Sequence, residues 1–166
     1  MKAESDAVLS ESDGRYLLDA IAWSRTARER GNRPFGAVIM ASDGALLAEA
    51  YCNTSETGDC TGHAETNAIR LATPRTSREV LATSTIYSSG EPCVMCAGAI
   101  FWSGIRRVVF GIDAVSLRVF RGEVAEQRDA ELSCRDVFAA SPHAIECIGP
   151  VMLKEASEPH VGFWKT

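Results

Sequence analysis

Apolar and polar residues recur with two different periods along the chain, and these periods predict its helices and strands. Between residues 14 and 30, apolar side chains recur at the spacing of one helix face: Leu17, Leu18, Ile21, Ala22 and Trp23. Asp13 precedes this segment as a candidate N-cap, and Gly31 follows it as a candidate stop. The first element is therefore predicted to be an amphipathic helix.

Shorter segments continue the pattern. Strands are predicted at residues 35–41, 45–51, 85–87, 107–111 and 144–148, with a turn at residues 42–44 joining the first two. Further helices are predicted at residues 64–72, 92–102 and 151–163. Residues 52–62 and 73–78 are interpreted as connections, and residues 113–138 as a polar stretch with one or two short helical pieces. Strands and helices therefore alternate over most of the chain.

This order of elements predicts an α/β fold. Helices that alternate with strands cover both faces of a sheet, which gives a three-layer α-β-α sandwich around a central five-stranded sheet. The sheet is expected to be mixed, because the first hairpin is antiparallel while the later strand–helix–strand units require parallel pairing. We expect residues 1–13 to be a flexible tail and residues 14–166 to form a single domain.

Composition and charge narrow the function classes. With 46% hydrophobic and 23% charged residues, the chain has too much apolar material to be mainly disordered. No run of about 18 apolar residues occurs, so no membrane span is expected. The net charge of −5 favours a small-molecule substrate over a nucleic acid. The polar, acidic N-terminus lacks the pattern of a signal peptide, so a cytoplasmic location is expected.

Six cysteines and three histidines limit the available metal sites. In a cytoplasmic chain the cysteines are expected to be thiols or metal ligands, not disulfides. Cys93 and Cys96 lie at the start of the helix predicted from Pro92, on one face, where the helix N-terminus stabilises thiolates. His63, between a loop and a predicted helix, completes a His-Cys-Cys set. Such a set holds catalytic zinc with the fourth position open to water.

Glu65 lies two residues after His63, at the start of the same predicted helix. A carboxylate there would lie beside the metal and transfer a proton from water to a leaving group. The pattern H-x-E followed by P-C-x-x-C is the signature of zinc deaminases. A redox-active CxxC and a structural zinc site are the weaker interpretations. A redox-active CxxC would not explain the HxE pattern. A structural zinc site normally needs four protein ligands, and a second CxxC that would supply them is absent from the sequence.

Three segments resemble the cytidine-deaminase-like superfamily of zinc deaminases. They are PFGAVI at residues 34–39, HAETNAIR at residues 63–70 and EPCVMCAGAI at residues 91–100. The resemblance spans about residues 14–113 and is weak beyond them. Within the superfamily, the chain is most similar to bacterial guanine deaminases and tRNA adenosine deaminases. The resemblance implies a five-stranded sheet between helices and a homodimer.

The resemblance also implies a hydrolytic deaminase with one zinc ion per subunit. His63, Cys93 and Cys96 would bind the zinc, and Glu65 would shuttle protons. The net reaction replaces an amino group on an aromatic nitrogen heterocycle by a carbonyl and releases ammonia. Expected contacts with the substrate are the backbone N–H of Ala64 and the side chains of Asn53, Phe35, Trp102 and Asp113. Asn53 is equally well interpreted as a turn residue.

Guanine is the first substrate expected. Phe101-Trp102, at the end of the helix that carries Cys93 and Cys96, resembles the aromatic pair of guanine deaminases and would stack on a planar base. Burial of Trp102 in the core or in a dimer interface is the alternative. The sequence does not separate guanine from other aminated heterocycles, namely guanosine, adenine, cytosine and amino-s-triazines. A tRNA-editing adenosine deaminase is the main alternative function, and a zinc-stabilised binding module without catalysis is the third. Retention of Glu65 argues against that module.

The remaining candidates lie outside the motifs. A tRNA substrate would need a basic patch, for which the chain offers Arg106, Arg107, Arg118 and Arg121. Cys60 is expected not to bind the metal, because a fourth protein ligand would occupy the water position. Ordinary thiols are expected at Cys52, Cys134 and Cys147, and structural or surface roles at His143 and His160. Phe163 and Trp164 either close the pocket over a base or anchor the last helix.

Overall fold

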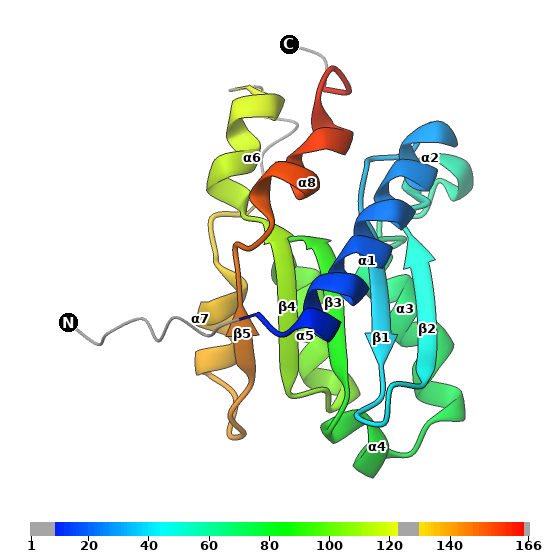
Figure 1. The fold of residues 1–166 in the computed structure, drawn as a ribbon, viewed down its shortest axis with the longest axis vertical. Coiled ribbons are helices and arrows are strands. Elements are labelled where there is room, and N and C mark those ends of the chain that lie inside the picture. Colours follow the sequence, from blue (N-terminus) through cyan, green and yellow to red (C-terminus); the bar gives the residue numbers. More distant parts are fainter. Residues whose placement is uncertain (1–8, 123–129, 165–166) are drawn as a thin grey trace, which may run out of the picture.

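The computed structural model describes residues 9–122 and 130–164 and shows a five-stranded sheet with helices on both faces (Figure 1). The strands are β1 (Gly36–Met40), β2 (Leu46–Tyr51), β3 (Thr85–Gly90), β4 (Arg107–Ile112) and β5 (Glu146–Ile148). Their order in the sheet is β2-β1-β3-β4-β5. β1 pairs antiparallel with β2 and β3, whereas β3, β4 and β5 are parallel. The predicted α/β fold with a mixed sheet is confirmed.

Three longer helices cover the sheet. α1 (Glu11–Glu29) lies across one face, and α3 (Ala64–Ala72) and α5 (Val94–Ser103) lie across the other (Figure 1). The shorter helices in the described residues are α2 (Thr54–Thr57), α4 (Arg78–Ala82), α6 (Ala114–Arg121), α7 (Cys134–Ala139) and α8 (Leu153–Ser157). Two 3₁₀ turns are η1 (Thr73–Arg75) and η3 (Glu158–His160). The sequence pattern predicted neither α2 nor α4.

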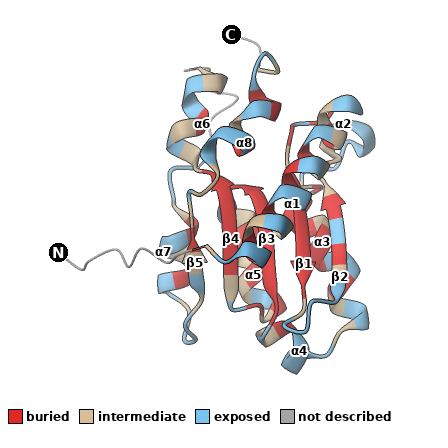
Figure 2. Cartoon of the chain, in the orientation of Figure 1, coloured by how far each residue is buried: buried red, intermediate tan, exposed pale blue. Residues whose placement is uncertain are grey.

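Each central strand contributes to two cores, because successive side chains point to opposite faces of a sheet. Val38 of β1 packs with Leu17 in the core under α1. Its neighbour Ile39 packs with Ile100 in the core under α3 and α5. All residues of β1 and β3 are buried (Figure 2). The ends of these strands therefore form a fixed base for the loops and helix starts that follow them.

The first helix starts earlier than predicted. Ser10 is its N-cap, and the Ser10 hydroxyl accepts a hydrogen bond from the backbone N–H of Asp13 at 3.0 Å. The Asp13 carboxylate accepts one in return from the backbone N–H of Ser10 at 3.3 Å. This capping box makes Asp13 the third residue of the helix and not its cap. Of the expected flexible tail, residues 11–13 are thus helical, and residues 1–8 lie outside the described residues.

The helix predicted at residues 151–163 is present only over a shorter range. Met152 has a left-handed backbone with φ of 51°, so α8 begins only at Leu153. After Ser157 the chain continues as the η3 turn, because Pro159 has no N–H with which to extend the α-helical pattern. The C-terminal segment is therefore a short helix followed by a compact turn, and this shape places Trp164 next to α6 and Phe35.

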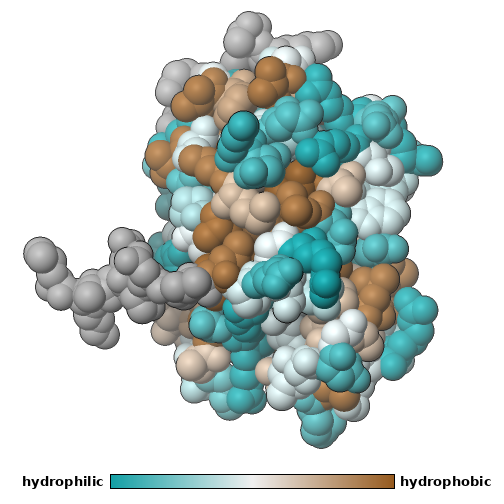
Figure 3. All heavy atoms as spheres, viewed as in Figure 1, coloured by the Kyte–Doolittle hydropathy of each residue, from teal (hydrophilic) through white to brown (hydrophobic). Residues whose placement is uncertain are grey.

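On the face shown in Figure 1, apolar side chains gather over the side that carries α6 and α8 (Figure 3). Val115 and Val119 of α6 and Leu153 of α8 are exposed. Within residues 9–122 and 130–164, none of the helices combines the length and apolar character needed to cross a membrane.

Candidate active site

The two sequence motifs meet where two helices begin. His63 is the N-cap of α3 and Cys93 is the N-cap of α5, both with extended backbone, and Cys96 is the third residue of α5. The loop before α5 follows directly on β3, which ends at Gly90. Both helices pack on the same face of the sheet, in one core. Their N-termini converge there and bring together side chains about 30 residues apart in the sequence.

The three predicted metal ligands are in contact. Nδ1 of His63 lies 3.5 Å from Sγ of Cys93 and 3.5 Å from Sγ of Cys96, and all three atoms lie within 4.8 Å of one another. Zinc bonds of about 2.3 Å to sulfur and about 2.0 Å to nitrogen, at a tetrahedral angle, imply a sulfur–nitrogen separation of roughly 3.5 Å. The spacing and the chemistry of this donor set therefore fit zinc, with one coordination position left for water.

The three ligand side chains shift one another's pKa values. A hydrogen bond from Cys96 lowers the pKa of the Cys93 thiol to about 4, and His63 acts in the same direction. The hydrogen bond to Cys93 also raises the pKa of His63. The bond to Cys93, together with burial, raises the pKa of the Cys96 thiol. Zinc binds thiolate and neutral imidazole, so its binding releases protons from this cluster.

Glu65 is held beside the ligands. It is the second residue of α3 and only 4% exposed. Its Oε1 accepts a hydrogen bond from the Ser88 hydroxyl at 2.8 Å, and its Oε2 lies 3.4 Å from Sγ of Cys96. Burial raises the pKa of Glu65, because the charged carboxylate loses its contact with water. A carboxylate with one oxygen fixed and a raised pKa is suited to accept and return a proton.

A cavity of about 40 Å³ adjoins the ligands and Glu65. Its walls combine apolar side chains with two arginines and a second carboxylate: Phe35, Cys52, Ile112, Ala114, Leu117, Arg33, Arg121 and Glu91. A second cavity, of about 360 Å³, shares Glu91, Cys93, Ala114 and Arg121 with the first. The sequence did not predict Ser88 or Arg33 as site residues, because neither belongs to the H-x-E or C-x-x-C pattern. It offered Arg121 only for a phosphate-binding patch, and Glu91 only as part of the EPCVMCAGAI segment.

The expected substrate contacts are not all placed at this cavity. Phe35 lines it, and Ala64 is the buried first residue of α3, next to His63. Asp113 is the N-cap of α6 and lines the larger cavity. Asn53 is the N-cap of α2, and its Oδ1 accepts a hydrogen bond from Nδ2 of Asn67 at 3.0 Å. Asn53 is not among the residues that line the smaller cavity, and its contact with the substrate stays a prediction.

Trp102 lies away from the ligands. It is at the far end of α5, its side chain is 77% exposed, and it lines a separate groove with Phe101. Within one chain, Trp102 therefore has no contact with the cavity that holds Glu65. The aromatic pair on which the expectation of guanine rested is not part of the wall of that cavity.

Trp164, near the C-terminus, contacts two residues that line the cavity, Arg121 and Phe35. The Arg121 guanidinium lies over the rings of Trp164, at 4.7 Å, and Phe35, at 5.9 Å. Nε1 of Trp164 donates to Nδ1 of His160 at 3.2 Å. His160 is buried, and burial lowers its pKa to about 3, so it is neutral and structural, as expected. Phe163 lies near the guanidinium of Arg28 and not at the cavity.

A Cys96→Ser protein is expected to lose most of its zinc. The hydroxyl is a much poorer ligand than a thiolate, and a site with two remaining protein ligands is incomplete. Zinc per chain after gel filtration, measured by atomic emission, checks this prediction. The matched control is Cys60→Ser, because Cys60 is exposed and outside the ligand cluster. Equal zinc contents in the two variants would contradict the assignment of Cys96.

Comparison with known proteins agrees with this site. Residues 10–112, more than half of the chain, match the family model for the cytidine and deoxycytidylate deaminase zinc-binding region. The chain belongs to this deaminase family. The expected superfamily and zinc cofactor are thereby confirmed, with His63, Cys93 and Cys96 as the candidate ligands. The protein is a zinc-dependent hydrolytic deaminase of a nucleobase or nucleoside.

Relatives of this deaminase differ in their substrates. A probable cytosine deaminase of Schizosaccharomyces pombe is 43% identical over 160 residues, which cover 96% of this chain and 97% of the relative. The guanine deaminase of Bacillus subtilis is 42% identical over 80 residues, 48% of this chain and 51% of the relative. A structure from a study of A-to-I editing by tRNA:A34 deaminases is 30% identical, with a TM-score of 0.71, and the match covers 88% of this chain and 99% of that one.

Proposed function

We propose that this deaminase acts on a free nucleobase, and that cytosine is its preferred substrate. The observation that carries the proposal is the lining of the cavity beside Glu65, where Phe35 and helix α6 place an aromatic ring and apolar side chains next to the ligand cluster. An aromatic and apolar lining of this kind suits the flat ring of a base. Hydrolysis would convert cytosine and water into uracil and ammonia.

The extent of the similarities supports cytosine over guanine. The probable cytosine deaminase resembles this chain over 96% of its length, which includes most of the C-terminal segment behind the cavity. The similarity to the guanine deaminase covers 48% of the chain. Guanine remains the second candidate, because the identity to the guanine deaminase over the matched residues, 42%, is close to the 43% of the probable cytosine deaminase. Trp102 is exposed and does not line the cavity beside Glu65, so within one chain it does not favour guanine.

The residues of this chain have separate tasks in the proposed reaction. Zinc, when bound, supplies Lewis-acid activation of water. The Glu65 carboxylate accepts a proton at Oε2 and returns it to the base and the leaving amine, while the Ser88 hydroxyl fixes Oε1. The backbone N–H of Ala64, at the start of α3 where helical N–H groups lack partners within the helix, is proposed to bind the base. Phe35 supplies an aromatic wall.

The arginines argue against a tRNA substrate. Arg107 pairs with Asp13 and Glu146, and Arg118 with Glu131. Arg121 is buried against aromatic rings. Three of the four arginines considered as a phosphate-binding patch therefore have partners within the described residues, Arg118 through an exposed ion pair. These contacts support a small-molecule substrate, and tRNA is the alternative that the substrate panel tests.

A homodimer is part of the proposal. Phe101 and Trp102 line an exposed groove of about 370 Å³ at the far end of α5, away from the ligands. An exposed aromatic side chain such as that of Trp102 is typical of contact surfaces between proteins.

The test is ammonia release from a substrate panel by the zinc-loaded protein. Cytosine, guanine, adenine, cytidine, guanosine and an unmodified tRNA are compared at equal concentrations, with the Glu65→Ala protein as the blank. We expect cytosine to give the highest kcat/KM, at least about tenfold above guanine, since one or two well-placed polar contacts are worth about that much. Faster release from guanine would reassign the substrate, and release from tRNA alone would overturn the proposal of a free base.

A further inference from the structure

Glu91 is a part of the EPCVMC motif that has no role in the chemistry described above. We propose that Glu91 is a positioning residue, which fixes helix α6, one wall of the substrate cavity, against the loop that carries Cys93. The kinetic consequence rests on the proposed function. The structural consequence does not, and it is tested separately below.

The backbone and the carboxylate of Glu91 join three elements. Its N–H donates to the carbonyl of Ile112, the last residue of β4, at 2.8 Å. Its Oε2 accepts a hydrogen bond from the N–H of Ala114 at 2.9 Å. Its Oε1 accepts one from the Ser133 hydroxyl at 2.9 Å and lies 3.7 Å from the Cys134 thiol. Glu91 thus connects the loop before α5 with the starts of both α6 and α7.

Helix α6 has no cap of its own. Asp113 occupies its N-cap position but makes no side-chain hydrogen bond to the helix. The carboxylate of Glu91 takes this role from outside the helix, and a negative charge is favourable at the positive end of the helix dipole. The helix has only eight residues, so the hydrogen bond from the N–H of Ala114 to Glu91 contributes substantially to the stability of its first turn.

The wall that Glu91 anchors belongs to the active site. α6 contributes Ala114, Leu117 and Arg121 to the cavity that contains His63 and Glu65. Cys93, two residues after Glu91, lines the same cavity, as does Glu91 itself. The shape of the cavity therefore depends on how α6 is held against the loop that carries Cys93, and Glu91 joins the two.

The geometry argues against a direct chemical role for Glu91. Both carboxylate oxygens accept hydrogen bonds from structural donors, namely the N–H of Ala114 and the hydroxyl of Ser133. By contrast, Glu65 has one oxygen close to the ligand Cys96. Replacement of Glu91 is consequently expected to weaken substrate binding, whereas replacement of Glu65 is expected to slow the chemical step.

The first measurement is hydrogen–deuterium exchange of the zinc-loaded protein, which needs no substrate. In Glu91→Ala, exchange in peptides from α6 is expected to rise roughly tenfold, while exchange in α1 stays unchanged, because the loss of a cap opens a helix locally. Ala114→Pro breaks the same link from the other side: proline is tolerated at the first position of a helix, and Asp113 already has the extended backbone that proline requires of its predecessor. The matched control is Glu79→Ala, an exposed glutamate at the start of α4. If exchange in α6 is the same in Glu91→Ala and Ala114→Pro as in the unsubstituted protein, the proposal is overturned.

The second measurement separates positioning from chemistry. On the substrate identified by the panel, Glu91→Ala and Ala114→Pro are expected to raise KM about tenfold with kcat within about threefold, since a displaced wall weakens binding more than proton transfer. Glu91→Gln keeps an acceptor for the N–H of Ala114 and is expected to restore most of the affinity. A fall of kcat by a hundredfold in Glu91→Gln, or loss of its zinc, would contradict a positioning role. If no base in the panel is a substrate, the proposed function fails, and the exchange data alone decide the role of Glu91.

Discussion

Replacement of Glu65 by alanine is expected to lower kcat by roughly 10³–10⁴-fold while zinc remains bound. The carboxylate lies beside the ligand cluster but is not one of its three members, so the metal does not depend on it. Its removal takes away the group that accepts and returns the proton, and in the buried site water does not replace it. Zinc per chain and single-turnover ammonia release, measured on the same preparation, check both halves of this prediction.

Two further variants define the role of Glu65. Glu65→Gln keeps a side chain of the same shape and its contact with Ser88, yet it lacks the basic oxygen, and it is expected to be as inactive as Glu65→Ala. Ser88→Ala keeps the carboxylate and removes only the hydroxyl that holds Oε1. Its kcat is therefore expected to fall about tenfold. Zinc loss in Glu65→Ala, or turnover within tenfold of the unchanged protein, would contradict the assigned role.

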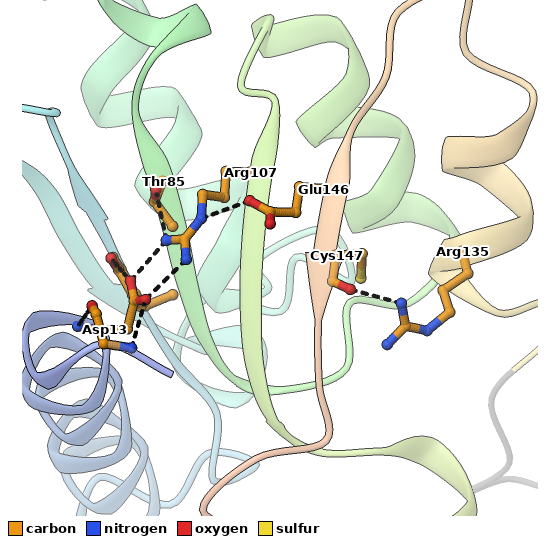
Figure 4. Close-up of polar contacts among 8 residues, drawn as sticks. Asp13, Thr85, Arg107, Arg135, Glu146 and Cys147 are labelled. Carbon is orange, nitrogen blue, oxygen red and sulfur yellow. Dashed lines mark hydrogen bonds and ion pairs between the residues drawn. The ribbon is translucent and has the colours of Figure 1, made fainter. Parts of the chain in front are cut away.

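Replacement of Arg107 by leucine is expected to lower the free energy of unfolding by about 2–4 kcal/mol. Arg107 donates to both oxygens of Asp13, at 2.7 and 2.9 Å, and to Glu146 at 2.8 Å (Figure 4). Tyr87 donates to Asp13 from β3 at 2.7 Å. The Asp13 side chain is only 6% exposed, so without Arg107 a carboxylate stays buried with only neutral donors. Urea unfolding at pH 7 measures the change.

This loss of stability is expected to depend on pH. Hydrogen bonds from Arg107 hold the pKa of the Asp13 carboxyl well below its usual range. At pH values above about 4 the carboxylate is charged in both the folded and the unfolded chain, and the pair contributes fully. Below about pH 4 the unfolded chain binds a proton first, so the contribution falls as the pH falls. The difference between Arg107→Leu and the unchanged protein should therefore be smaller at pH 3 than at pH 7.

The same ion pair provides a control for the active site. Arg107 begins β4 and Asp13 lies in the first turn of α1, whereas the zinc ligands follow the opposite end of the parallel strand β3. Arg107→Leu is therefore expected to retain its kcat at temperatures where it is folded. In the double variant Asp13→Asn/Arg107→Leu, the free energy of unfolding should fall by less than the sum of its decreases in the two single variants. Full additivity would show that the two residues do not stabilise the fold through each other.

Local spacing in the sequence determined the chemical identity of the site. Cys93 and Cys96 are one helical turn apart, and His63 and Glu65 adjoin one helix start, so the geometry within each motif is set by a few consecutive residues. The alternation of strands and helices likewise determined the mixed sheet and its two helical layers, because each apolar stripe must be buried against another element. These features depend on residues near one another in the chain.

The tertiary structure alone decided which distant partner each polar side chain has. Ser88 holds Glu65 across 23 residues, Glu91 meets Ser133 across 42, and Arg107 meets Asp13 across 94. No periodicity encodes such pairs, since they depend on strand register and on which helix ends converge. For the same reason the sequence left two roles open for Trp102 and offered Arg107 for a phosphate-binding patch, whereas packing leaves Trp102 exposed and pairs Arg107 with a buried carboxylate.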